Sequence, residues 1–242
     1  MSYWTAIAII KQAQGELGLP QSPTVVGSTE VAAIQFLALL NACGNELLTT
    51  YPWAQFIKTQ TFDTVNGQDK YPMPADWLYY LDQTQWDRTN HWPLLGPKSA
   101  QEWSWLKNST FAPAPRLRYR VFADNLHIHP VPGTSPYTLS MEYVIKNWVL
   151  GNSGGIPTPA DMVATDSDEV LYNPWLVVKF LKLKFYELKG LEATGVRTDF
   201  VRMFETLTGK DKGAPTLSLV TQPTPALIGP WSVPDGSWNA TP

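Results

Sequence analysis

The 242-residue chain contains one cysteine and three histidines, which limits the chemistry available to it. Cys43 has no partner for a disulfide within the chain. It could pair with a distant histidine as a nucleophile, but its apolar, helix-like surroundings favour a small core residue. His127 and His129 could share one strand face as metal ligands. Only His91 remains, and no cysteine or paired carboxylate lies near them in the sequence. We therefore expect a solvated or interface strand, with no metal and no other cofactor.

Charged residues are also scarce, at 16% of the chain against ~25% in typical soluble domains. The net charge of −3 gives no overall attraction to nucleic acid or to an anionic membrane. There is no run of about 18 apolar residues and no basic N-terminal region with a cleavage pattern, so we expect a soluble protein made in a reducing cytoplasm. Eleven tryptophans and ten tyrosines indicate a surface partly used in partner binding.

Signatures of nucleotide and calcium binding are missing. Residues 151–155 contain glycines but lack the Lys-Ser/Thr pair of a phosphate-binding loop. The acidic residues of 161–169 could attract a cation, but their spacing lacks the central glycine and terminal glutamate of an EF-hand. We expect them instead to cap the following helix and to place negative charge at its N-terminus. The sequence therefore indicates a protein that is not an enzyme.

Arg116, Arg118 and Arg120 form the one concentrated basic feature of the sequence. They alternate with apolar residues, which predicts a half-buried strand with a basic outer face. Such a face could follow a phosphate backbone, but no aromatic residues accompany the arginines at a regular spacing for base stacking. Salt bridges between subunits, or a solvated face, account for the pattern better. The three arginines are thus candidates for a subunit interface or for a basic channel face.

The N-terminal region predicts two helices. The first covers residues 3–17, and the second begins at an N-cap at Ser28 and ends before Pro52. Two helices joined by a loop are expected to pack as an antiparallel hairpin. After the second helix, apolar residues recur at every second position, which is typical of strands. Asn66-Gly67 predicts a β-hairpin between strands at 59–65 and 70–73.

The middle of the chain predicts mainly strands. We expect strands or extended segments in 77–92, a short helix from Ser99, and a three-stranded antiparallel sheet between about 115 and 149, turned at Asp124-Asn125. Residues 151–159 are predicted to be a flexible connector. Two more helices follow, the first from an Asn173 cap to Gly190 and the second ending at Gly209.

This order of elements predicts an α+β fold. N- and C-terminal helices form one bundle, an antiparallel β domain is inserted between them, and an extended C-terminal arm follows. The expected parts are a helical hairpin at 1–58, a β-rich insertion with one short helix at 59–160, helices completing the bundle at 161–213, and the arm at 214–242.

The arm is unusual because residues 214–242 hold six prolines, two tryptophans and a single charge, Asp235. A solvated disordered tail is normally charged and poor in aromatic residues. Here the prolines prevent a helix of useful length, while the apolar residues favour burial. We expect an extended arm that docks in a groove on a partner, although the segment could instead wrap its own domain. The residues expected to bind the partner are Leu227, Ile228, Pro230, Trp231, Val233 and Trp238.

Several stretches carry a family resemblance. They are KQAQGELGLP at 11–20, Tyr51-Pro52-Trp53, MPADWLYYLDQTQWDRTNHWPLLGPKSAQEWSWLK at 73–107, and MEYVIKNWV at 141–149. Over roughly residues 5–205 the chain resembles the head-to-tail adaptor proteins of tailed bacteriophages, also called connector or tail-accessory proteins, especially those of short-tailed phages.

This resemblance implies a structural protein of the virion head–tail junction, assembled in the host cytoplasm. Such adaptors form a homo-oligomeric ring, usually a dodecamer, beneath the portal protein. The ring extends the DNA channel and carries a downstream tail or nozzle protein, and several members insert a C-terminal arm into the portal. Packaged DNA would pass without sequence-specific binding, and no membrane is involved. In this chain the arm is longer and richer in tryptophan than the resemblance implies, so docking on a neighbouring subunit is an alternative.

Two other functions are less well supported by the residues. A cell-wall hydrolase would need carboxylates such as Glu16 or Glu46, but both fall in helices where a solvated position is far commoner. A carbohydrate-binding tail component would use exposed tryptophans, yet the aromatic residues are spread over helices, strands and arm rather than forming one platform.

Overall fold

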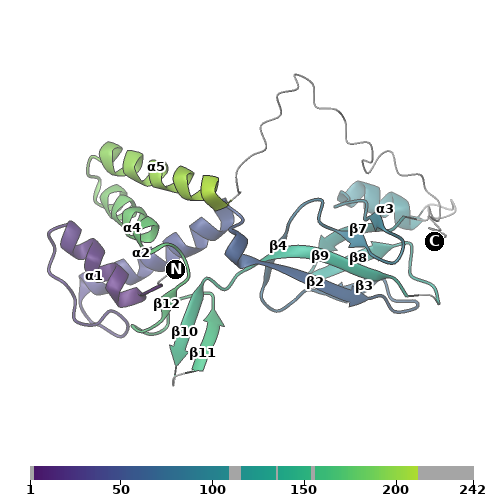
Figure 1. Cartoon of the computed structure of the whole chain (residues 1–242), viewed down its shortest axis with the longest axis horizontal. Helices are drawn as coiled ribbons and strands as arrows, with labels where there is room; N and C mark the ends of the chain where they lie inside the picture. The colour runs from purple at the N-terminus through teal and green to yellow at the C-terminus, as the bar shows by residue number, and fades with distance from the viewer. Residues whose placement is uncertain (1–2, 109–115, 135, 154–155, 212–242) are drawn as a thin grey trace. The chain divides into compact units, whose positions relative to one another are not determined.

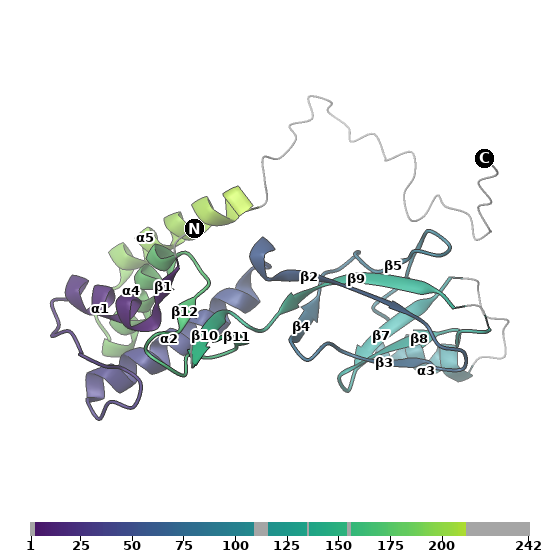
Figure 2. The same ribbon diagram turned by 60° about the horizontal axis from the view of Figure 1, so that its bottom comes forward.

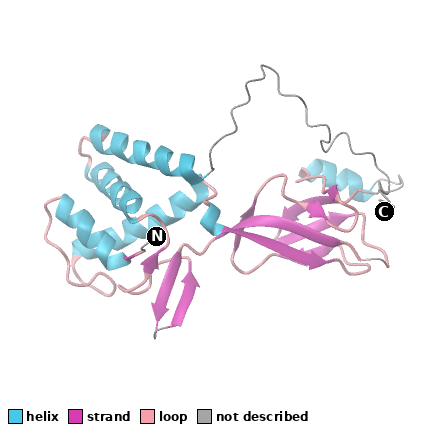
Figure 3. Ribbon diagram, viewed as in Figure 1, coloured by secondary structure: helices cyan, strands magenta, loops and turns pink. Residues whose placement is uncertain are grey.

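The computed structural model describes residues 3–108, 116–134, 136–153 and 156–211 (Figure 1). The fold is α+β, which confirms the predicted class (Figure 3). The described residues divide into two compact units. The helical unit comprises the residues up to Phe56 and those from Ile145 onwards, and the β unit comprises Ile57–Val144.

The helical unit is a bundle centred on one helix. Its helices are α1 (Ala6–Glu16), α2 (Val31–Thr50), α4 (Pro174–Lys189) and α5 (Thr194–Asp211), with the short 3₁₀ helix η1 (Ala54–Phe56) after α2. Helix α4 contacts α1, α2 and α5, which confirms that N- and C-terminal helices share one bundle. The expected α1–α2 hairpin contributes less, because both helices pack mainly on the wide apolar stripe of α4.

Local signals set most helix ends. The side chain of Asn173 accepts from the backbone N–H of Trp175 at 3.1 Å, and α4 ends at Gly190 with φ 66° in the left-handed region. Both ends are as predicted. The predicted cap at Ser28 is wrong, because α2 begins at Val31 and Glu30 occupies the N-cap position without a side-chain hydrogen bond. The Ser28 hydroxyl instead accepts from the N–H of Glu30, which shapes the preceding turn.

Helix α2 has the length and hydropathy of a membrane-spanning helix. Buried core helices of soluble proteins can have the same length and hydropathy. In the bundle, Phe36 of α2 stacks on Phe185 of α4 with ring centroids 5.2 Å apart, and Leu40 and Leu47 are buried. Cys43 is fully buried on the same face, and burial raises the pKa of its thiol to about 12. The predicted core position of Cys43 is therefore confirmed.

A small sheet completes the helical unit. Its strand order is β1 (Trp4–Thr5), β12 (Glu169–Val170), β10 (Val149–Ser153) and β11 (Ile156–Ala160), all antiparallel. The flexible connector predicted at 151–159 is thus wrong, since these residues contribute to the β10 and β11 pair. Strand β11 accommodates Pro157 and Pro159 because it is an edge strand, where one side needs no ladder hydrogen bonds.

The acidic stretch at 161–169 binds the backbone of nearby loops rather than the N-terminus of α4. Asp168 is buried, and its carboxylate accepts from the backbone N–H groups of Ala164, Thr165 and Asn152. Burial raises the pKa of Asp168, but these hydrogen bonds and that of the Thr165 hydroxyl outweigh it and lower the pKa. The predicted role in capping the following helix is wrong, because the cap of α4 is Asn173 and the carboxylate of Asp168 is used locally.

The described residues of the β unit form two sheets and one helix (Figure 2). One sheet has the order β2 (Ile57–Asp63), β9 (Thr138–Ile145), β5 (Trp86–Asp87) and β6 (Trp92–Pro93), with β4 (Trp77–Tyr80) also pairing with β9. The other has the order β3 (Lys70–Pro72), β8 (Asn125–His129) and β7 (Arg118–Phe122). Helix α3 (Ala100–Asn108) packs on this second sheet through Trp103, which contacts His127 and His129.

Both sheets bury an apolar face in a common core. The buried residues of this core are Tyr71, Leu94, Leu117, Tyr119, Leu126, Ile128, Leu139 and Met141. Strand β9 supplies Leu139 and Met141 from the first sheet, and β7 and β8 supply Tyr119, Leu126 and Ile128 from the second. Because His127 and His129 alternate with Ile128 on β8, they lie on the opposite face, beneath α3.

The hairpin predicted between 59–65 and 70–73 is wrong. Asn66-Gly67 does form a turn, with Gly67 at φ 76°, but the strands it joins belong to different sheets. Strand β2 pairs with β9 over seven residue pairs, whereas β3 has only three residues and pairs with β8. The Asn66-Gly67 turn predicts that the chain reverses direction there. Which strand pairs with β2 is decided instead by the longer set of hydrogen-bonded residue pairs that it makes with β9. The predicted three-stranded sheet at 115–149 is wrong for the same reason, because β9 leaves β7 and β8 to pair with β2.

Two local predictions in the β unit are confirmed. Strands β7 and β8 form a hairpin, although its turn residues are Ala123 and Asp124, one position earlier than predicted. Both have positive φ, 49° and 53°, as a two-residue hairpin turn requires. Helix α3 begins after Ser99, whose hydroxyl accepts from Glu102 N–H while the Glu102 carboxylate accepts from Ser99 N–H, each at 3.2 Å. This reciprocal pair is a capping box.

Candidate interaction surfaces

The predicted arm lies outside the described residues, but the point from which it leaves is well defined. The backbone N–H of Ala54 donates to the carboxylate of Asp211, the last residue of α5, at 3.0 Å. Two turns earlier, Phe204 packs edge-on against Tyr51 and Trp53 with ring centroids 6.4 and 5.8 Å away. The C-terminal end of α5 is therefore held against residues 51–54, directly before β2.

The three arginines of the predicted basic face are placed differently. Arg116 precedes β7 and is buried, whereas Arg118 and Arg120 are half-buried on the strand. Register sets Arg118 opposite His129 and Arg120 opposite His127, so these four side chains share one sheet face. We call them the Arg/His face. Sequence reasoning treated the arginines and histidines separately, and the turn predicted at Asp124-Asn125 would have set Arg120 opposite His129 instead.

An aromatic and cationic stack lies at one end of the Arg/His face. The guanidinium of Arg120 sits 4.8 Å from the ring centroid of Phe122, and Phe122 stacks on His127 with centroids 3.8 Å apart and planes 9° apart. Trp103 of α3 contacts both histidines, with centroids 6.4 Å from each. Lys107 extends from α3 to Asp69 at 2.6 Å. The histidines are thus covered, while the arginines lie at the border.

The pKa values of both histidines are lowered, mainly by burial. Burial lowers the pKa of His127, and Lys70, Lys107 and Arg120 lower it further, partly opposed by Asp69. Burial also lowers the pKa of His129. Within the described ranges, no group of three or more His, Cys, Asp or Glu side chains is arranged to hold a metal ion.

The carboxylates considered for hydrolysis are ion-paired with α4. Lys182 lies 2.7 Å from Glu16, and Lys184 lies 2.7 Å from Glu46. Burial raises the pKa of Glu16, but the hydrogen bonds from Lys182 and Gln12 outweigh it and lower the pKa. A general acid in a glycosidase needs the opposite shift. These pairs connect α1 and α2 to α4.

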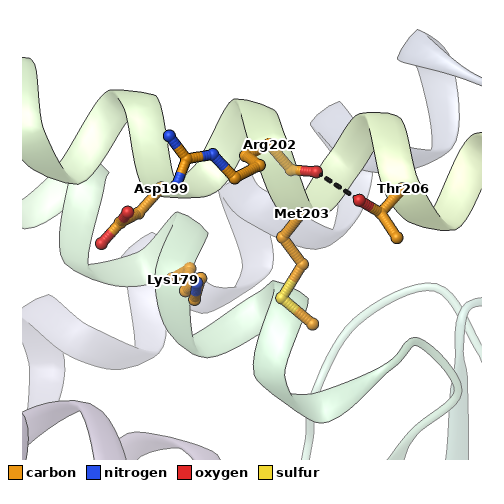
Figure 4. Close-up of a pocket in the computed structure, with 5 residues that line it drawn as sticks. All are labelled: Lys179, Asp199, Arg202, Met203 and Thr206. Atoms are coloured by element: carbon orange, nitrogen blue, oxygen red, sulfur yellow. Dashed lines mark hydrogen bonds between the residues drawn. The ribbon is translucent and has the colours of Figure 1, made fainter.

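Two of the hollows lined by described residues are candidate sites. Figure 4 shows one of about 250 Å³ between α4 and α5, lined by Lys179, Asp199, Arg202, Met203 and Thr206. The Thr206 hydroxyl donates to the backbone carbonyl of Arg202, its own helix, at 2.8 Å. The hollow is lined by side chains of both charges and by a methionine. Its one acidic side chain, Asp199, is not hydrogen-bonded to a basic residue of the lining.

Exposed tryptophans are distributed over several elements. Trp86 lies on β5, Trp105 on α3 and Trp175 on α4, with 43%, 59% and 46% of their surface exposed. Trp86 also lines a hollow of about 320 Å³ with Asp87, Arg88 and His91. Trp175 belongs to the helical unit, whereas Trp86 and Trp105 belong to the β unit.

A comparison with protein families identifies the class. The model of the SU10 adaptor protein family matches residues 4–214, which include both structural units. The chain therefore belongs to the SU10 adaptor protein family. It is a bacteriophage head–tail adaptor, which confirms the resemblance to head-to-tail adaptors and places the protein at the head–tail junction of the virion. A search of curated proteins finds no match.

Proposed function

We propose that this adaptor is a non-enzymatic structural protein that forms a dodecameric ring beneath the portal protein. The ring extends the DNA channel and offers a platform for a downstream tail or nozzle protein. The observation that supports this most strongly is the family match over residues 4–214. Ring formation needs a rigid subunit with two different contact surfaces, and identical copies joined head to tail then close around an axis.

The C-terminal arm docks on the portal or on a neighbouring subunit in this proposal. Its composition supports this role, because prolines hold a chain partly extended and so reduce the entropy lost on binding. At a rise of ~3.1 Å per residue, an extended arm of this length spans on the order of 90 Å. Trp231 and Trp238 are the proposed anchors, since buried tryptophan is enriched among residues that dominate binding energy.

The remaining details of the proposal follow from charge and family. A net charge of −3 suits a channel through which DNA slides without sequence-specific binding. Arg118 and Arg120, with the buried Arg116, form a subunit contact or a basic channel lining. Assembly takes place in the host cytoplasm, and the phage is short-tailed.

Electron microscopy of the purified chain mixed with its portal protein tests this proposal. We expect twelve-fold rings stacked on portal rings. A matched set of variants separates the arm from the rest: Trp231→Ala and Trp238→Ala should reduce portal capture, whereas Trp105→Ala on the exposed face of α3 should not. If neither a ring nor a complex with portal forms, the proposed function is wrong.

A further inference from the structure

Strand β2 differs from the other sheet edges among the described residues. It is seven residues long, contains no proline, and pairs only with β9. The other edges are short, contain proline or are covered. Strands β1, β4 and β6 have two, four and two residues, β3 ends in Pro72, and β11 contains Pro157 and Pro159. Strand β7 is covered by the segment at 95–98, where Tyr119 N–H donates to Leu95 O at 3.2 Å. Long uncovered edges normally receive a partner or a protecting feature.

The hydrogen-bonding groups on this edge can be assigned. On β9, the carbonyl oxygens of Thr138 and Glu142 accept from the segment at 81–88, on the side away from β2. Leu139, Met141 and Tyr143, which alternate with them along β9, therefore bond to β2. Their partners on β2 are Lys58, Gln60 and Phe62. The N–H and C=O groups of Thr59 and Thr61 consequently point to the free edge.

The last described residue, Asp211, is held near the segment that leads into β2. Asp211 is hydrogen-bonded to Ala54, and β2 begins three residues later, at Ile57. Three residues span at most about 11 Å, and the five steps from Asp211 to Thr216 span up to about 17 Å. The chain after α5 can therefore reach the first residue of β2 without strain. Because both segments leave the same point, the arm would run parallel to β2.

The first part of the arm has the pattern of a strand. Residues 216–221 read Thr-Leu-Ser-Leu-Val-Thr, without proline or charge, between Pro215 and Pro223. Leucine alternates with hydroxyl-bearing residues, and threonine and valine favour strands. A strand placed there would set Leu217 and Leu219 on one face, where they can cover the half-buried ring of Phe62, itself packed against the core.

We propose that residues 216–221 of the same chain bind the free edge of β2 as an additional parallel strand. The short connection gives this segment a high effective concentration at the edge, which favours it over a strand from another molecule. The pairing fixes the first part of the arm and leaves residues 222–242, with Trp231 and Trp238, to reach a partner. The proposal does not depend on the proposed function, since an adaptor with a wholly free arm would still form rings.

Residue-resolved hydrogen exchange on the full chain tests the pairing. In the unaltered chain, we expect the amides of Thr59 and Thr61 to exchange at least about tenfold more slowly than in the variant Leu219→Pro. Proline removes the backbone N–H at the centre of the proposed strand, so this variant should not pair with β2. The amide of Gln60, which faces β9, should remain protected in both proteins. The matched control Gly229→Pro places the same change beyond the strand and should leave all three amides unaltered. Equal exchange of Thr59 and Thr61 in all three proteins overturns the proposal.

Disulfide formation distinguishes the occupant of the edge. Thr59→Cys is combined with one further substitution at a time: Leu217→Cys, Ser218→Cys, Leu219→Cys or Val220→Cys. Cys43 contributes no background, because it is buried and burial raises its pKa to about 12. We expect a bond within one chain for at least one pair and none for Thr59→Cys with Ala226→Cys. Bonds only between different chains mean that a second copy occupies the edge, and absence of any bond means that the edge is free; either result overturns the proposal.

Discussion

Replacing Gly44 with alanine tests the packing of the helical unit most directly. Gly44 lies inside α2, where alanine is normally better than glycine by about 1 kcal/mol because glycine loses more backbone entropy on folding. From the sequence alone, Gly44→Ala is therefore expected to stabilise the protein. The structure predicts the reverse.

A methyl group at Gly44 has no space. An ideal Cβ at this position lies 2.4 Å from Cζ2 of Trp148, whose side chain is fully buried. The ring is confined further because Tyr172 packs beside it, with centroids 6.1 Å apart, and donates its hydroxyl to the Gly44 carbonyl at 3.0 Å. Overpacking of a core costs about 1–3 kcal/mol, and the upper end applies because a buried tryptophan has nowhere to move. After the gain in helix propensity, we expect a net loss of about 1–2 kcal/mol.

Urea unfolding followed by circular dichroism measures this loss. Gly209→Ala in α5 is the matched control, because apart from the adjoining backbone of its own helix no described atom lies within 4 Å of its Cβ, and the substitution should stabilise by up to about 1 kcal/mol. Adding Trp148→Phe to Gly44→Ala should recover part of the loss, since the smaller ring makes space for the methyl group. A stabilising effect of Gly44→Ala on its own would refute the close packing of α2 on Trp148.

Three further predictions concern pH, the buried carboxylate and the arm. Because the pKa values of His127 and His129 are lowered, the folded state binds fewer protons than the unfolded chain below about pH 6.5. The contribution of the two histidines to the free energy of unfolding is therefore complete above about pH 6.5. It is lost as the pH falls below that value, by up to about 1.4 kcal/mol per pH unit for each histidine. Urea titrations at several pH values measure this loss, and His127→Gln should reduce its dependence on pH. Asp168→Asn should destabilise by about 2 kcal/mol, measured by thermal unfolding, because an amide replaces a buried carboxylate that accepts several backbone hydrogen bonds. Trp231→Ala and Trp238→Ala should each weaken binding to portal protein by at least about 2 kcal/mol in calorimetry, without changing the melting temperature of the adaptor.

The candidate surfaces were only partly accessible to sequence reasoning. The alternation at 116–121 predicted a strand with basic residues on one face, and Arg118 and Arg120 do lie there. Arg116 departs from the pattern because β7 begins after it. That α3 covers the histidines through Trp103 depends on a helix more than twenty residues away in the chain, and nothing in the local pattern indicates it.

The sequence by itself determined those features that depend on neighbouring residues. Asn173 and Gly190 bound α4 and the Ser99–Glu102 pair starts α3, because capping interactions act within a few residues. Only the tertiary structure decided the strand pairing. Strand β2 pairs with β9, which lies about 80 residues later in the chain. Trp148 packs against Gly44 although about 100 residues separate them in the sequence. Such contacts depend on which apolar faces pack best once the chain has folded, and periodicity alone contains no information about the partner.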